Sequence, residues 1–194
     1  MVLSFFVSLS LIALFTARDA ALLPALLLPV AVHEMGHVVA LKLLGFRLHA
    51  LVLEARGLMI RYDGIGGWLQ EAAAALAGPL AGLLYGLFLL PTDRGLPEWL
   101  SVSGSVSLML TGFNLLPILP LDGGRALSAL CFHLLEEEEA GRLFWRISAT
   151  ALALLLLLGS VLLVRQKSTA LLAAGLWLLA ENERLPLVKG RNLL

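Results

Sequence analysis

The stretch Val32-His33-Glu34-Met35-Gly36-His37-Val38 carries a His-Glu-x-x-His motif inside an apolar segment. On an α-helix, residues four apart share a face, so His33 and His37 can offer ring nitrogens to one metal ion with Glu34 beside it. Motifs this short also occur by chance. Here residues 24–44 are almost wholly apolar and long enough for a membrane helix, in which ionisable side chains are costly and functional by default. The stretch therefore predicts a membrane helix with a metal site.

The composition is that of an integral membrane protein. Of the 194 residues, 59% are hydrophobic and 14% are charged, which is far from the average of soluble domains. The net charge is zero and no basic stripe with aromatic residues occurs, so no nucleic-acid partner is expected. The single cysteine, Cys131, excludes an intrachain disulfide and is expected to be a small buried hydrophobe.

The apolar runs predict an all-α polytopic membrane protein with about six transmembrane helices. The expected helices cover residues 2–16, 20–44, 68–90, 99–116, 143–164 and 168–180, and the sixth is short for a complete span. Residues 126–135 form a possible short helix that leaves the membrane, and residues 136–139 are four glutamates expected at a solvated end. In the third helix, Gly78, Gly82 and Gly86 recur every four residues, which predicts close packing of another helix. Glu71 is expected to be an interfacial charge or, less simply, part of a substrate entrance.

Between the second and third helices, the period of the sequence changes. Residues 46–62 are rich in Leu, Val and Ile with scattered charges, and Gly57 supplies a turn, so a small membrane-associated β-hairpin is predicted. The alternative is an irregular amphipathic loop at the membrane surface. His49 lies far from the histidine pair and is expected to be solvated rather than a ligand.

A broken segment is predicted at residues 114–125. Two prolines and the Gly123-Gly124 pair do not continue a helix, and unwound backbone at membrane depth is tolerated where it is buried in protein or lines a wet cavity. A carboxylate on such a segment can point inward. Asp122 is therefore the predicted third ligand, since two histidines and one carboxylate make up a known catalytic zinc set. The alternative for Asp122 is a turn or helix-capping aspartate.

The two motifs together resemble the site-2 protease family of zinc intramembrane metalloproteases, and most closely the stage IV sporulation protein FB type. The resemblance rests on His33-Glu34-x-x-His37 and on Asn114-x-x-Pro117-x-x-Pro120-Leu121-Asp122-Gly123, and it covers residues 20–131. It implies a three-helix core, Zn²⁺ held by His33, His37 and Asp122, Glu34 as general base, and Asn114 as a contact to the substrate or its oxyanion. The hairpin and the glycine-rich connector after it resemble the family's membrane-associated β region.

The resemblance also sets the expected domain organisation. We expect a single membrane-embedded metalloprotease domain over residues 1–194, with a catalytic core at 20–131, accessory helices at 1–17 and 143–180, and no PDZ or CBS domain. The expected function is hydrolysis of peptide bonds in or near transmembrane segments of membrane-tethered proteins, such as a single-span protein or a membrane-bound transcription factor. One alternative is a catalytically silent zinc-binding membrane protein or chaperone of the same fold, which would not need Glu34. Another is a metal transporter, which should show polar residues along several helices.

The chain is expected in the cytoplasmic membrane of a bacterium. The placement of its basic residues predicts which way it is oriented there. With six crossings, ten of the 14 basic residues fall on one side, and short loops rich in Lys and Arg stay in the cytosol. Both termini, the hairpin and residues 136–139 are therefore expected to be cytosolic, with the active site nearer that face. The ten residues are Lys42, Arg47, Arg56, Arg61, Arg125, Arg142, Arg146, Arg184, Lys189 and Arg191.

Overall fold

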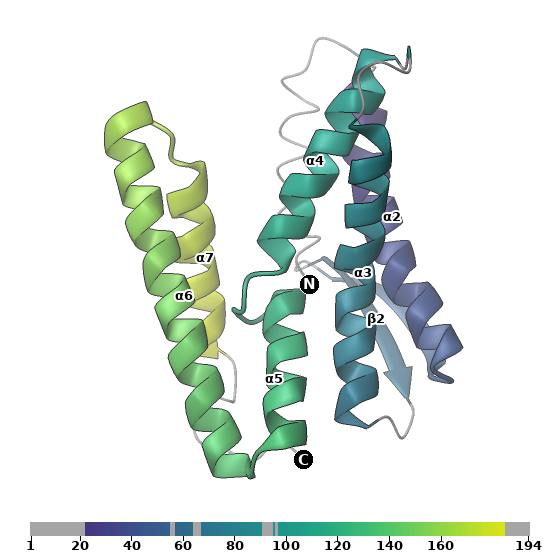
Figure 1. The fold of residues 1–194 in the computed structure, drawn as a ribbon, viewed down its shortest axis with the longest axis vertical. Coiled ribbons are helices and arrows are strands. Elements are labelled where there is room, and N and C mark those ends of the chain that lie inside the picture. The colour runs from purple at the N-terminus through teal and green to yellow at the C-terminus, as the bar shows by residue number, and fades with distance from the viewer. Residues whose placement is uncertain (1–21, 55–56, 64–66, 91–94, 96, 185–194) are drawn as a thin grey trace. The chain divides into compact units, whose positions relative to one another are not determined.

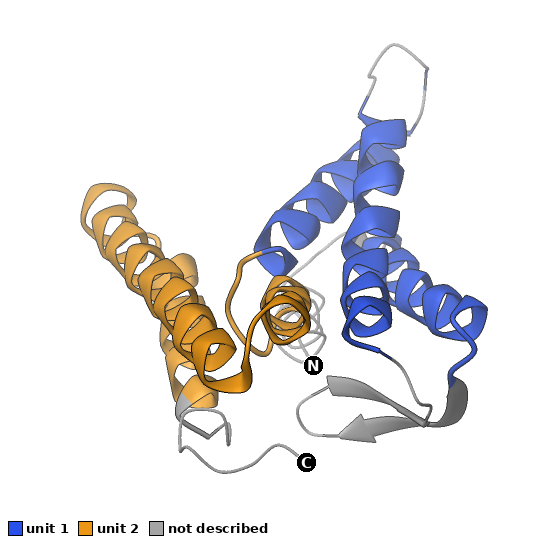
Figure 2. Cartoon of the chain, turned by 60° about the horizontal axis from the view of Figure 1, so that its bottom comes forward, with its two compact units in different colours: residues 1–115 blue, residues 116–194 orange. Residues whose placement is uncertain are grey.

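The computed structural model describes residues 22–54, 57–63, 67–90, 95 and 97–184. Two compact units divide the chain, at residues 1–115 and 116–194 (Figure 2). The elements, all but β1 labelled in Figure 1, are α2 (Leu22–Leu43), β1 (Arg47–Glu54), β2 (Gly57–Asp63), α3 (Trp68–Leu89), α4 (Glu98–Asn114), α5 (Asp122–Leu134), α6 (Glu137–Gln166) and α7 (Ala170–Arg184). The organisation of residues 1–194 as a single domain stays a prediction.

Three described helices are long and apolar enough to cross a membrane, at Leu23–Leu43, Trp68–Leu89 and Glu137–Gln166. The helix α4 has 17 residues, and the apolar part of α7, Ala170–Asn182, is shorter than a usual span. Large apolar side chains such as Leu43 and Val164 are 82% and 83% exposed, as expected of a surface that faces lipid. The first predicted helix lies outside the described residues, so the count of six spans stays a prediction.

In the first unit, α2, α3 and α4 pack against one another. Small residues allow the close approach: a Cβ on Gly36 would lie 2.5 Å from the carbonyl oxygen of Ala77, and one on Gly86 would lie 2.6 Å from Leu108 Cδ2. Hydroxyl groups of α4 add hydrogen bonds, since Ser107 Oγ donates to the carbonyl oxygen of Gly82 at 2.7 Å. The predicted packing role of the glycine stripe is thus confirmed.

Two antiparallel strands, β1 and β2, follow α2 in the segment predicted as a hairpin. Their register pairs Leu51 with Ile60 and Glu54 with Gly57, and it shifts between Leu48 and Ala50. Only the backbone of these strands is described, so the interpretation of His49 as a solvated residue stays a prediction.

In the second unit, α5 packs on α6 and α6 packs on α7. The glutamates of residues 136–139 are exposed as predicted. The last three of them form the first turn of α6, which is longer than the predicted 143–164. Acidic side chains in a first turn favour a helix because they face the positive end of its dipole. The prediction that Gly123 and Gly124 break the helix was wrong, because α5 begins at Asp122 and includes both.

The reason lies at Gly124. A Cβ there would lie 2.4 Å from the carbonyl carbon of Ile118, so the missing side chain lets the preceding segment fold back against the first turn of α5. The glycine serves close packing rather than a turn. The non-helical backbone is therefore limited to residues 115–121.

Candidate metal centre

The histidine pair lies on one face of α2, as the motif predicts. His33 and His37 are 4% and 7% exposed, and their rings meet edge to face with centroids 5.0 Å apart. The Nε2 atoms lie 3.3 Å from each other. Two nitrogens bound tetrahedrally to one zinc ion at about 2.0–2.1 Å lie about 3.3 Å apart, so the pair fits such an ion.

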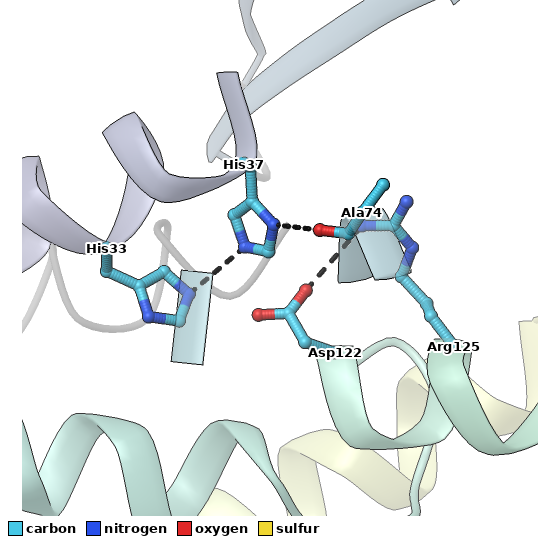
Figure 3. Close-up of polar contacts among 5 residues, drawn as sticks. All are labelled: His33, His37, Ala74, Asp122 and Arg125. Carbon is cyan, nitrogen blue, oxygen red and sulfur yellow. Dashed lines mark hydrogen bonds and ion pairs between the residues drawn. The ribbon is translucent and has the colours of Figure 1, made fainter. Parts of the chain in front are cut away.

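The tautomer of His37 is set by α3. Nδ1 of His37 lies 2.8 Å from the carbonyl oxygen of Ala74 (Figure 3). A carbonyl accepts only, so Nδ1 carries the proton and donates it, which leaves Nε2 as a lone-pair donor. Metal-ligating histidines are commonly oriented by such a backbone carbonyl.

A second feature of α3 makes room for the His37 ring. A Cβ on Gly78 would lie 2.2 Å from His37 Nε2, closer than two such atoms can approach. A Cβ on Gly82, one turn further along α3, would lie 2.7 Å from Thr111 Oγ1 and 3.7 Å from His33 Nδ1. The glycine stripe of α3 therefore adjoins the histidine pair as well as α4.

Glu34 follows His33 on α2 and is half-buried. A residue adjacent to a helical ligand points about a quarter-turn away from it, so Glu34 does not share the face of the two imidazoles. This placement suits a carboxylate that acts beside a metal rather than on it.

Asp122 opens α5 in the second unit and is 6% exposed. Its Oδ1 lies 3.6 Å from Nη1 of Arg125, one turn along the same helix, and the Arg125 side chain is 41% exposed (Figure 3). Charge-assisted hydrogen bonds are about 2.7–2.9 Å long, so this ion pair is loose. His33, His37 and Asp122 are all buried, and each offers one atom that can ligate a metal.

Asn114 ends α4 and is 1% exposed. Its Nδ2 donates to the carbonyl oxygen of Leu110 at 3.0 Å. Its Oδ1 has no hydrogen-bond partner in the part of the chain that the structure describes. Most buried side-chain polar atoms are hydrogen-bonded, so this oxygen is one of the exceptions in the described part of the chain.

Sequence reasoning missed the two groups of α3 that hold His37. The Ala74 carbonyl belongs to the backbone, so its bond to His37 cannot be predicted from the type of residue at position 74. Gly78 was recognised as a packing residue, but its neighbour is the histidine ring as well as a helix. The four-residue spacing of Gly78 and Ala74, which puts both on one face of α3, is the signal that could have found them.

Known protein families and individual proteins are similar to this chain in sequence. The family model described as Peptidase M50B-like matches residues 6–119, and the model described as Peptidase family M50 matches residues 91–158. A zinc metalloprotease of Methanocaldococcus jannaschii is 34% identical over 118 residues, which are 57% of this chain and 34% of that protein. A relative from Synechocystis, also named as a zinc metalloprotease, is 30% identical over 162 residues, 71% of this chain and 42% of its own length.

A solved structure shows the fold. The site-2 protease from Methanocaldococcus jannaschii superposes with a TM-score of 0.63 at 24% identity, covering 98% of this chain and 88% of that one. The apolar helices and these matches define an integral membrane protein with the site-2 protease fold. The chain belongs to the Peptidase M50B-like family, whose model matches more than half of it. It spans between a third and a half of the curated relatives' length.

Proposed function

We propose that this chain is a zinc-dependent intramembrane protease of the site-2 type. The observation that carries the proposal is the buried pair of Nε2 atoms 3.3 Å apart on α2, with Glu34 beside them. Such a donor set on an apolar helix supports a metal site, because ionisable side chains within a membrane span are costly and are functional by default. The names of the relatives support zinc and proteolysis.

His33, His37 and Asp122 would hold the ion. Two histidines and one carboxylate leave a fourth position open on a catalytic zinc. The burial of Asp122, and the fact that its carboxylate and the two imidazoles each offer one atom that can ligate a metal, support this set. When bound, zinc supplies Lewis acidity, which lowers the pKa of a water molecule and polarises the scissile carbonyl.

Two side chains would act on the reacting groups. Glu34 accepts the proton of the attacking water and later donates it to the leaving amine of the cleaved peptide bond. Asn114 orients the unwound substrate: its Oδ1 accepts a main-chain N–H, and its second amide N–H donates toward the substrate carbonyl. The partnerless Oδ1 among the described residues supports this contact.

The substrate would be a membrane-tethered protein, a single-span protein or a membrane-bound transcription factor, cut in or near its transmembrane segment. A membrane helix hides its peptide bonds, so the substrate unwinds first. An extended peptide then needs main-chain partners, and an outer edge of the two-stranded sheet, which pairs with no third strand among the described residues, would offer them.

The setting of the enzyme belongs to the same proposal. We place it in a bacterial cytoplasmic membrane, with about six spans over one domain of residues 1–194, cytosolic termini and the metal nearer the cytosol. By its two motifs the chain resembles the stage IV sporulation protein FB type, and we propose that subtype for it. The basic residues of the short loops support the orientation.

One set of variants tests the proposal. Glu34→Gln should abolish proteolysis and keep zinc, because the amide has the same shape but does not take a proton from water. His37→Ala and Asp122→Ala should lose both. Zinc is measured by elemental analysis of the purified chain. Cleavage is measured as new N-termini and uncut single-span proteins in cells that express wild type or Glu34→Gln.

Each outcome separates the candidate functions. A general base contributes about 10²- to 10⁴-fold, so Glu34→Gln cutting at the wild-type rate would remove the proteolytic mechanism. A wild-type chain that binds zinc, with a set of cleaved proteins identical to Glu34→Gln, would favour the catalytically silent zinc-binding protein. A wild-type chain that never holds zinc would remove the metal site.

A further inference from the structure

The turn before Asp122 is held by a side chain from far along the sequence. Nδ2 of Asn182, in α7, donates a hydrogen bond to the carbonyl oxygen of Leu119 at 3.0 Å, across 63 residues. Both residues belong to the unit drawn in orange in Figure 2. The helix α7 lies outside the residues that either family model matches. We infer that Asn182 is a positioning residue, which fixes the turn that presents Asp122 to the metal.

The carbonyl of Leu119 takes its partner from outside the turn. Residues 118–121 close through a hydrogen bond from Leu121 N to Ile118 O at 2.9 Å, with Leu119 and Pro120 at the centre. Leu119 is 9% exposed, and a buried carbonyl in a membrane protein must be paired within the protein. Asn182 supplies that donor.

Residues 118–121 pack closely against the first turn of α5. Ile118 and Leu121 are fully buried, and the backbone of Ile118 lies against Gly124. The Leu119 side chain packs in a cluster with Cys131 and Phe144. Because these residues are closely packed, a shift of the Leu119 carbonyl would also displace the backbone of Asp122, three residues later.

This inference rests on the proposed function, since it gives Asp122 the role of a metal ligand. Its test uses the full chain purified in detergent. Zinc affinity is measured by competition with a chelating dye, the coordination sphere by the absorption spectrum of the Co²⁺-substituted protein, and folding by circular dichroism.

The decisive variant is Asn182→Asp. It keeps the size of the side chain but removes the donor and sets an acceptor against the Leu119 carbonyl. We expect native helix content, zinc affinity about 10-fold weaker and an altered Co²⁺ spectrum, as found when a partner that orients a ligand is lost. Asn182→Gln retains the amide and should recover part of the affinity, which a bulk-packing role would not predict.

The matched control is Ser160→Ala in the same unit. It removes a hydrogen bond of 2.8 Å from Ser160 Oγ to the carbonyl oxygen of Leu156, within α6 itself. Zinc affinity and the Co²⁺ spectrum should match wild type.

The outcomes distinguish the inference from the function it rests on. Wild-type zinc affinity in Asn182→Asp, while Asp122→Ala loses the metal, overturns the inference and leaves the proposed function standing. A wild-type chain that binds no zinc, or an Asp122→Ala chain that binds it as tightly as wild type, overturns both. If Asn182→Asp does not fold, Asn182→Ala takes its place with the same expectation and the same overturning result.

Discussion

His37 and Gly78 lie in contact across α2 and α3, so closely that a methyl group on Gly78 would sit 2.2 Å from Nε2 of the imidazole. The same ring is held through Nδ1 by the Ala74 carbonyl, one turn earlier on α3. The helix α3 therefore fixes both the tautomer and the position of a predicted metal ligand.

Gly78→Ala should weaken zinc binding without unfolding the chain. The imidazole is a movable side chain, so it would swing away from the new methyl group, lose its bond to Ala74 and carry Nε2 away from His33. Loss of a ligand's orienting partner costs about 10- to 100-fold in metal affinity. Chelator competition on purified protein measures the change.

Gly86→Ala is the control for this prediction. Its Cβ would meet Leu108 Cδ2 at 2.6 Å and the carbonyl oxygen of Gly104 at 3.0 Å, so it crowds α3 against α4 without touching a histidine. It should lower stability and spare zinc affinity. Equal zinc affinity in the two glycine variants would show that Gly78 serves packing alone.

Ser107→Ala should destabilise the first unit. Ser107 is fully buried and donates to the carbonyl oxygen of Gly82 on the neighbouring helix at 2.7 Å. Interhelical hydrogen bonds in membranes are worth about 0.6 kcal/mol on average and up to about 1.7 kcal/mol. Unfolding by sodium dodecyl sulfate in mixed micelles gives the difference in free energy of unfolding.

Ser105→Ala removes a comparable bond in a different place. Ser105 is exposed and donates to the Ser101 carbonyl of its own helix at 3.1 Å. Its free energy of unfolding should stay within about 0.5 kcal/mol of wild type. If the two serine variants are equally stable, the Ser107 bond contributes nothing to helix association.

Local patterns were enough to predict much of this fold. The spacing of His33 and His37 sets them on one face of any helix, and the apolar runs locate α2, α3 and α6 because a membrane requires their length and composition. The glycine stripe of α3 also predicted its packing, because small residues at four-residue spacing let another helix approach closely.

Relationships between distant residues could not be predicted in this way. The bond from Asn182 to Leu119 and the contact of Gly124 with Ile118 depend on tertiary packing, and neither residue type indicates its partner. The rule that a glycine pair ends a helix failed at Gly123 and Gly124, because close packing outweighs helix propensity there.

Cysteine labelling tests the predicted orientation in the membrane. Single cysteines at Thr92 and Glu138 are introduced after Cys131, which is buried, is replaced by alanine. We expect an impermeant thiol reagent on intact cells to label the variant at Thr92 and not the one at Glu138, which is exposed and should lie in the cytosol. Permeabilised cells should label both. The reverse pattern in intact cells would invert the proposed topology.

The last prediction concerns substrate capture at the edge of β2. If the unwound substrate adds as a strand, proline at successive positions from Leu58 to Tyr62 should slow cleavage where the N–H points away from β1, because proline removes the donor. Where the N–H pairs with β1, proline should instead disturb the hairpin. Proline on the outer edge of β1, from Leu51 to Leu53, is the control and should leave cleavage unchanged. Rates are measured with one membrane-tethered substrate identified by the Glu34→Gln comparison. Uniform activity along β2 in folded variants would mean that this edge does not bind substrate.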